Sequence, residues 1–244
     1  MDTRALPVEN GFRLRGGQVT RTEAFVDAAF AFTLTLLVIS VDRVPSTIQE
    51  LLDALKGVPA FAACFAQLGL FWHGHSRWSR RYGLDDGRST LLSLLLVFLV
   101  MVYVYPLKLL FGTFFAWITG GWIPSPLERL SGYDDIRIMF IVYGLAFATL
   151  SLCLAALYSH ALRQRAVLDL DLEETAQTAA EVAVLRWAAL VGALSLLTAL
   201  AMPAVPPYWL AGLPGLVYFL MNLSYWVGKR AAGRARRRYG AGSS

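Results

Sequence analysis

The sequence predicts an all-α membrane protein with six transmembrane helices. Of its 244 residues, 57% are hydrophobic and only 16% are charged. The mean hydropathy is +0.52, which is too apolar for an ordinary soluble domain of this length. The apolar residues form six runs near the length of roughly 20 residues that a bilayer-spanning helix needs. We therefore expect a single transmembrane domain over 1–244, with spans at about 24–41, 58–72, 91–115, 138–158, 187–205 and 208–227.

The first three spans are marked by residues near their ends. The first contains one charged residue, Asp27, in its opening turn. The second begins with Pro59, which the first turn of a helix accepts because that position has no intrahelical partner for an N–H. The third is the longest run and follows a charged loop. We expect Asp85 and Asp86 in that loop to cap the start of the third helix.

The last three spans are separated by one polar segment and one tight break. Residues 165–182 alternate acidic residues with leucines and then become rich in alanine, which indicates a loop flanked by helices rather than a second domain. Pro206 and Pro207 predict a tight turn between the fifth and sixth spans. The two cysteines, Cys64 and Cys153, lie inside apolar runs, where we expect them to act as small hydrophobic residues.

The distribution of positive charge predicts the orientation in the membrane. If alternate loops lie on opposite sides, 17 of the 22 lysines and arginines fall in the N-terminal segment, the 73–90 loop, the 159–186 segment and the C-terminal tail. Cytoplasmic loops carry such an excess. We therefore expect a multi-pass protein of the cell membrane with both termini in the cytoplasm. The basic 228–244 tail is expected to contact anionic lipid headgroups rather than nucleic acid.

The first span carries a stripe of residues that can line a pore. Ala28, Phe32, Thr35 and Ile39 are spaced i, i+4, i+7 and i+11, so they share one helix face, with Leu36 beside it. When copies of such a helix surround an axis, apolar rings gate by dewetting and a threonine oxygen can meet an ion. Periodicity alone still favours ordinary helix packing, because every helix of a bundle has an inward stripe.

Two short motifs favour the pore interpretation. The first helix opens with Arg21-Thr22-Glu23-Ala24-Phe25-Val26-Asp27, and the second span ends with Trp72-His73-Gly74-His75-Ser76-Arg77. The first resembles the Arg-x-x-x-Phe-Ser-Asp signature of the transmembrane protein 175 family of potassium channels, and the second resembles that family's tryptophan–histidine segment. Arg21, Phe25, Asp27, Trp72 and His75 match these motifs, whereas Val26 replaces the serine. The resemblance covers about the first 115 residues, and the six-span layout extends it along the chain.

The resemblance implies a homotetrameric, potassium-selective channel in which the first helix of each copy lines a central pore. It places Phe32 at the narrowest hydrophobic ring, where family members usually have isoleucine or leucine. Thr35 then falls on a position implicated in selectivity, and Leu36 and Ile39 follow along the pore. Potassium ions and membrane lipids are the implied partners, and no cofactor is needed.

The resemblance also implies a cluster that ties the first helix to the second. Arg21, Trp72 and His75 are expected to form one hydrogen-bonded and cation–π group, which we interpret as structural, with proton sensing by the histidine left open. A metal site is not expected at His73 and His75, because residues i and i+2 on a helix point about 200° apart.

Other functional classes are less well supported by the sequence. One alternative is a non-conducting membrane scaffold or sensor whose axis is plugged by Phe32. Another is a proton-coupled transporter in which Asp27 and His75 titrate. An enzyme is not expected, because the sequence has no glycine-rich phosphate loop, no Ser-His-Asp order and no paired intramembrane carboxylates.

Overall fold

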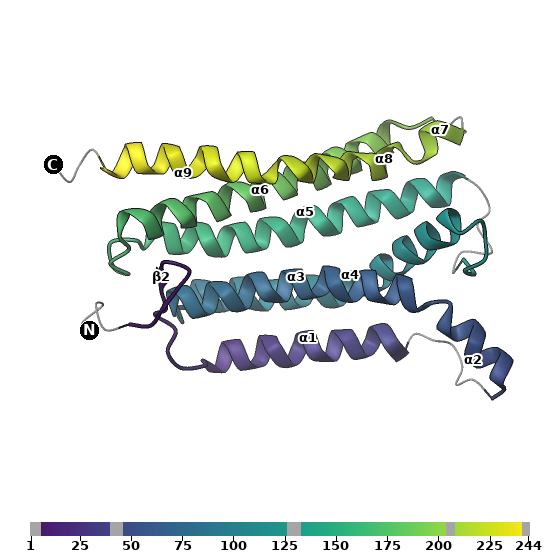
Figure 1. The fold of residues 1–244 in the computed structure, drawn as a ribbon, viewed down its shortest axis with the longest axis horizontal. Coiled ribbons are helices and arrows are strands. Elements are labelled where there is room, and N and C mark those ends of the chain that lie inside the picture. The colour runs from purple at the N-terminus through teal and green to yellow at the C-terminus, as the bar shows by residue number, and fades with distance from the viewer. Residues whose placement is uncertain (1–5, 40–45, 126–132, 204–207, 241–244) are drawn as a thin grey trace.

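The structure, a computed structural model, describes residues 6–39, 46–125, 133–203 and 208–240, and most of these are helical. The helices run beside one another in an elongated bundle, with a small β-hairpin at one end (Figure 1). In this hairpin β1 (Val8–Glu9) pairs antiparallel with β2 (Phe12–Arg13). Asn10 and Gly11 at the turn both have positive φ, which is the backbone geometry that an Asn-Gly hairpin turn favours.

The first half of the chain forms one layer of the bundle. α1 (Arg21–Ile39) packs mainly on α3 (Val58–Tyr82) and α4 (Gly87–Ile118). The short α2 (Ile48–Leu55) precedes α3 and is inclined to it by 43°. The Asp86 carboxylate accepts hydrogen bonds from the first backbone amides of α4, which confirms the cap expected there. Asp85 accepts instead from the Thr22 hydroxyl of α1, at 3.2 Å.

The second half of the chain forms the other layer. α5 (Tyr133–Arg163) packs against α6 (Leu172–Ala201), and α6 packs against α9 (Ser224–Gly240). Between α6 and α9 lie α7 (Tyr208–Ala211), α8 (Leu213–Leu216) and the 3₁₀ helix η2 (Val217–Leu223). Glycines let α5 and α6 approach closely, since a Cβ on Gly192 would lie 2.9 Å from the Ala148 nitrogen. Backbone contact at small residues is typical of helices packed in membranes.

The helix bounds differ from the expected spans in five places. The helix α2 was not expected. α3 continues through most of the 73–90 segment, because its arginines pair with acidic residues elsewhere: Arg77 contacts Glu181 at 2.7 Å. α6 begins at Leu172, where Asp171 and Glu174 form a capping box.

The segment 208–227 is broken into short helices, because Pro214 has no N–H and interrupts the helical ladder. The expected 228–244 tail is helical through Gly240.

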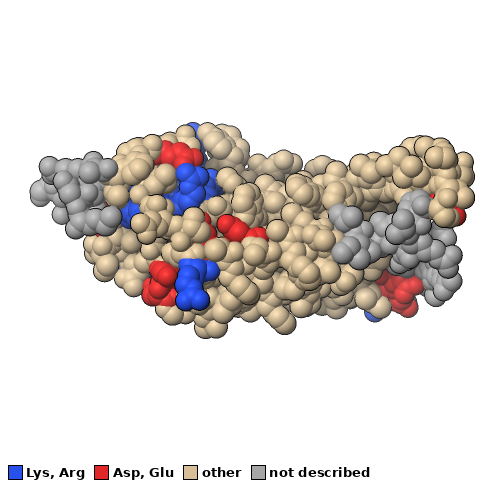
Figure 2. Space-filling view, turned by 90° about the horizontal axis from the view of Figure 1, so that it is seen from below, with Lys and Arg blue, Asp and Glu red and all other residues tan. Residues whose placement is uncertain are grey.

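The structure supports a membrane location for its long helices. Among the described residues, α4, α5 and α6 are long and apolar enough to cross a membrane, and α2 with α3 adds a fourth if that bent pair is one span. α1 and the segment Tyr208–Leu223 are not among the described helices that are both long and apolar enough. Figure 2 shows the charged side chains of one face gathered mostly toward the two ends, with an uncharged band between them. The expected tight break at Pro206 and Pro207 lies outside the described residues.

Candidate functional site

The two faces of α1 have different surroundings. One face is buried against the layer of α3 and α4, and it comprises Val26, Phe30, Thr33 and Leu37. The stripe predicted from the sequence lies on the other face, where Ala28, Phe32 and Thr35 are exposed. Phe32 has 53% of its surface accessible. The chain by itself therefore leaves an apolar face of α1 uncovered.

The remaining stripe residues lie at the edge of this face or beyond it. Leu36 is half-buried. Ile39 ends α1, and its side chain lies outside the described part of the chain. Phe25, from the opening signature, is also exposed. The exposed side of this helix thus carries residues from both the signature and the stripe.

The exposed threonine has a defined hydroxyl orientation. The Thr35 hydroxyl donates to the Ala31 carbonyl of the preceding turn at 3.0 Å. A hydroxyl has one hydrogen and two acceptor lone pairs, so this bond uses the donor and leaves the oxygen lone pairs for another partner. On an exposed helix face, that oxygen is suited to meet a cation.

The signature aspartate joins α1 to α3. Asp27 accepts a hydrogen bond from the Trp72 indole N–H at 2.8 Å. Val26, at the position where the family has serine, is fully buried, so its apolar side chain packs in the core. Asp27 and Trp72 therefore connect the start of the exposed helix to its neighbour.

Arg21, Trp72 and His75 do not come together as one cluster within a single chain. His75 is buried, and its Nε2 lies 2.9 Å from the Ser93 hydroxyl of α4. Arg21 is exposed, while Trp72 bonds to Asp27. Residues six apart on a helix differ by about 240° in direction, so Arg21 does not share the face of Asp27. His73 is exposed, so the two histidines point in different directions, as expected.

Replacing Trp72 by phenylalanine is expected to lower the free energy of unfolding by about 1.5–3 kcal/mol, because a half-buried carboxylate loses its hydrogen-bond donor. Thermal unfolding of the purified protein in detergent measures this change. Asp27→Asn keeps an acceptor oxygen for the indole and should cost less. Equal melting temperatures for Trp72→Phe and the parent protein would contradict the assigned contact.

A second charged cluster lies at the end of the bundle that carries the β-hairpin. The Glu174 side chain is fully buried and accepts from the Arg13 and Arg15 guanidinium groups at 2.8 and 2.7 Å. Glu174 is in the first turn of α6, ahead of the apolar stretch that begins near Trp187. Burial alone would raise the pKa of Glu174, but the hydrogen bonds from Arg15 and Arg13 outweigh burial and hold the pKa at about 2. The carboxylate is therefore charged at neutral pH.

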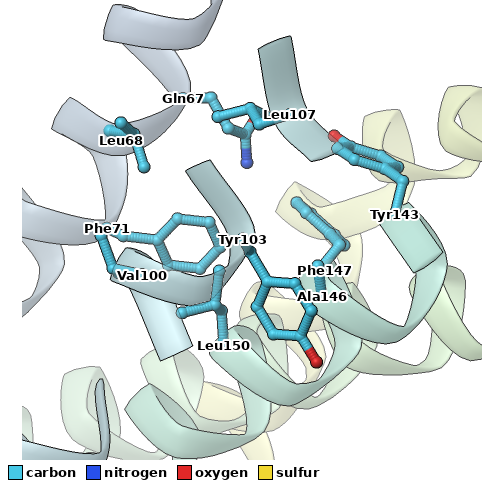
Figure 3. A pocket seen from close by; sticks show the side chains of 10 residues that line it. All are labelled: Gln67, Leu68, Phe71, Val100, Tyr103, Leu107, Tyr143, Ala146, Phe147 and Leu150. Atoms are coloured by element: carbon cyan, nitrogen blue, oxygen red, sulfur yellow. The ribbon is translucent and has the colours of Figure 1, made fainter. Parts of the chain in front are cut away.

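A small apolar hollow lies between α3, α4 and α5, and Figure 3 shows the side chains around it. Its lining is aliphatic or aromatic apart from Gln67 and the hydroxyls of Tyr103 and Tyr143, and it comprises Gln67, Leu68, Phe71, Val100, Tyr103, Leu107, Tyr143, Ala146, Phe147 and Leu150. None of these side chains is charged at neutral pH, and most of the lining is apolar.

Comparisons with known proteins identify the family. Residues 21–106 match the family described as endosomal/lysosomal potassium channel TMEM175. A protein of Marivirga tractuosa named "Potassium channel" is 36% identical over 172 residues, which are 68% of this chain and 69% of that protein. The crystal structure of the potassium channel MtTMEM175, as a threonine-to-alanine variant in complex with a Nanobody-MBP fusion protein, matches with a TM-score of 0.80 and 30% identity over 94% of this chain and 100% of that chain. The chain therefore belongs to the TMEM175 family of potassium channels, which confirms the resemblance carried by its first two motifs.

Proposed function

We propose that this chain is one subunit of a potassium-selective channel in the cell membrane, and that four copies surround a pore lined by α1. The observation that carries this proposal is the exposed stripe of Ala28, Phe32 and Thr35 on a helix whose other face is buried. Lipid tails cover an apolar helix face as well as a protein surface does, so family membership is what favours further copies around an axis as the partner. Family membership supports potassium as the permeant ion.

The proposed membrane arrangement has six crossings. These are α1, the bent α2–α3 pair, α4, α5, α6 and the segment from Tyr208 into α9, with both termini in the cytoplasm. The excess of lysine and arginine at the hairpin end supports this orientation. Exposed cations of α9 then face anionic lipid headgroups near the membrane surface: Lys229, Arg230, Arg234, Arg237 and Arg238.

In the proposed pore, Phe32 and Thr35 of α1 have different roles. Four Phe32 side chains around the axis form an apolar constriction that excludes water, so that an ion must shed part of its hydration shell to pass. Thr35 lies nearly one turn further along the helix. Its hydroxyl hydrogen is held by the Ala31 carbonyl, so four oxygens with free lone pairs replace lost water near the constriction. Leu36 and Ile39 continue the pore lining.

Potassium flux into proteoliposomes tests this proposal. The parent protein is expected to conduct potassium in preference to sodium, and Thr35→Ala is expected to lower that preference about tenfold, which corresponds to about 1.4 kcal/mol of discrimination. Thr33→Ala is the matched control, because Thr33 donates to the Ala29 carbonyl on the buried face of the same helix. It should leave the selectivity unchanged.

The outcomes separate the channel from its alternatives. Phe32→Leu should raise the flux, because leucine is smaller than phenylalanine at the constriction. Flux in the variant with a silent parent would mean that Phe32 plugs the axis, as in a scaffold or sensor. Silence in both proteins, or equal selectivity in Thr35→Ala and Thr33→Ala, would refute an α1-lined potassium pore.

A further inference from the structure

Residues 6–17 carry the β-hairpin and lead to α1, and we refer to them as the N-terminal clamp. We propose that this clamp fixes the start of α1 to α6, so that movement at the cytoplasmic end of α6 and α9 is transmitted to the pore helix. The effect on ion flux rests on the proposed channel function. The effect on the stability of the first turns of α1 does not.

Two arginines of the clamp, Arg13 and Arg15, bind the start of α6. Arg13 and Arg15 both bond to the buried carboxylate of Glu174, which also accepts from the backbone N–H of Arg13 at 2.8 Å. Arg15 reaches further, donating from Nε to the Leu168 carbonyl at 2.7 Å and from Nη2 to the Asp169 carbonyl at 3.1 Å. Removing one member of a buried ion pair leaves its partner uncompensated, so loss of the Glu174 charge is expected to weaken this attachment.

The apolar part of the clamp fills a site on α3. The Phe12 side chain is fully buried, with its ring 5.5 Å from the Tyr82 ring and edge-on to it. The Arg81 guanidinium lies over the same ring, 4.6 Å from its centroid, a favourable cation–π arrangement. The clamp therefore bonds to α6 through charge and to α3 through Phe12.

The clamp then crosses the turn between α3 and α4 in backbone contact. The Gly16 N–H donates to the Arg80 carbonyl at 3.0 Å. A Cβ on Gly16 would lie 2.5 Å from the Ser79 carbonyl oxygen, so a larger residue does not fit. Gly83 has φ +58, and a Cβ on it would lie 2.9 Å from the Arg15 carbonyl oxygen. The path of the chain at this point is closely defined.

This path ends at the first turn of α1. Only residues 18–20 separate the clamp from Arg21, and the Glu23 carboxylate accepts from the Ser79 hydroxyl at 2.9 Å. Among the described elements, α1 packs mainly on α3 and α4, whereas α6 packs mainly on α5 and α9. Figure 1 shows the hairpin at the end of the bundle where α1 begins and α6 starts. The clamp is therefore a direct link from α6 to the start of α1. It lies beside the contacts of α6 with α3, where Arg77 pairs with Glu181 and Tyr82 bonds to Thr178.

The end of α9 meets the same region. Arg236 of α9 forms an ion pair with Glu173 at 2.7 Å, and Gly240 lies against Leu172. These contacts are on the first turn of α6, next to Glu174. A force on the basic end of α9 is therefore applied to the turn that holds the clamp.

Glu174→Gln tests the proposal, with Glu173→Gln as its matched control. Both variants replace one glutamate of the same turn. Glu174→Gln removes the two ion pairs with Arg13 and Arg15 of the clamp, whereas Glu173→Gln removes the pair with Arg236 of α9. Hydrogen exchange of the amides of residues 21–27 and potassium flux are measured on the purified full chain in membranes. In Glu174→Gln we expect exchange at 21–27 to rise at least tenfold and flux to change several-fold. In Glu173→Gln, which leaves the clamp attached to α6, we expect the exchange at 21–27 to keep its parent value.

Arg15→Gln provides a second test if Glu174→Gln does not fold, because it removes the Arg15 bonds from the clamp to α6 and to the turn that precedes it, while leaving α6 unchanged. It should reproduce the faster exchange at 21–27. Faster exchange confined to residues 12–17, with parent values at 21–27, would overturn the proposal. If the parent carries no potassium flux, the channel function fails, and the exchange at 21–27 still decides whether the clamp holds α1.

Discussion

Gly192→Leu is expected to lower the free energy of unfolding by about 3 kcal/mol, at the upper end of the range for overpacked cores. At this position a Cβ would lie 2.9 Å from the Ala148 nitrogen and 3.1 Å from the Gly144 carbonyl oxygen. These are backbone atoms of α5, which cannot turn aside as a flexible side chain can. The two helices must therefore separate, and the variant should unfold at a lower temperature in detergent and show a smaller monodisperse fraction.

Gly69→Leu is the matched control for this substitution. Gly69 lies within α3, and a Cβ there would meet no atom of the described chain within 4 Å beyond its own helix backbone and sequence neighbours. Leucine also has a higher helix propensity than glycine, so Gly69→Leu should be as stable as the parent or slightly more stable. If Gly192→Leu melts at the same temperature as Gly69→Leu, α5 and α6 do not pack as closely as described.

Phe12→Ala is expected to cost about 3–5 kcal/mol of local stability, the range for large-to-small substitutions of buried aromatic residues. The loss falls on the N-terminal clamp, because the Phe12 ring is the part of the clamp that is buried against Tyr82 and Arg81 of α3. We expect the clamp to detach from α3 while the helices remain folded. Trypsin cleavage after Arg13 and Arg15 should then become at least tenfold faster.

Phe98→Ala is the control for the loss of an aromatic ring. Phe98 lies on α4 with 61% of its surface exposed, so its removal leaves no cavity in the protein. Cleavage after Arg13 and Arg15 should proceed at the parent rate in this variant. Parent-like cleavage of Phe12→Ala would mean that Phe12 does not hold the clamp.

The helical class and several local features were predictable from the sequence, since they depend on neighbouring residues. Apolar run length indicates the long helices, and the position of Asp86 before α4 indicates its cap. Two local signals were missed. Ile48, Leu51, Leu52 and Leu55 have helical spacing after the N-cap Thr47, which marks α2. Asp171 and Glu174 have the spacing of a capping box, which marks the early start of α6.

The clamp and the helix contacts were not predictable in this way. Arg13 and Glu174 are 161 residues apart in sequence, and no local pattern relates them. Hydropathy predicts a loop where the arginines of α3 lie, because charged residues lower the hydropathy of that segment. Their acidic partner, Glu181, lies on another helix and gives no local signal. On α1, by contrast, helical period alone places Ala28, Phe32 and Thr35 on one face, and all three are exposed. That they line a pore stays a prediction.

The placement of the hairpin beside the end of α9 bears on how copies of this chain can be joined. Arg13 contacts Glu174 and Gly240 contacts Leu172, so the beginning and the end of the described chain meet the same turn of α6. A short flexible peptide from the end of one copy to the start of the next would stay on one side of the membrane. Copies can therefore be linked in tandem without an added membrane crossing. Such concatemers allow the number of copies that carry Thr35→Ala in one assembly to be chosen.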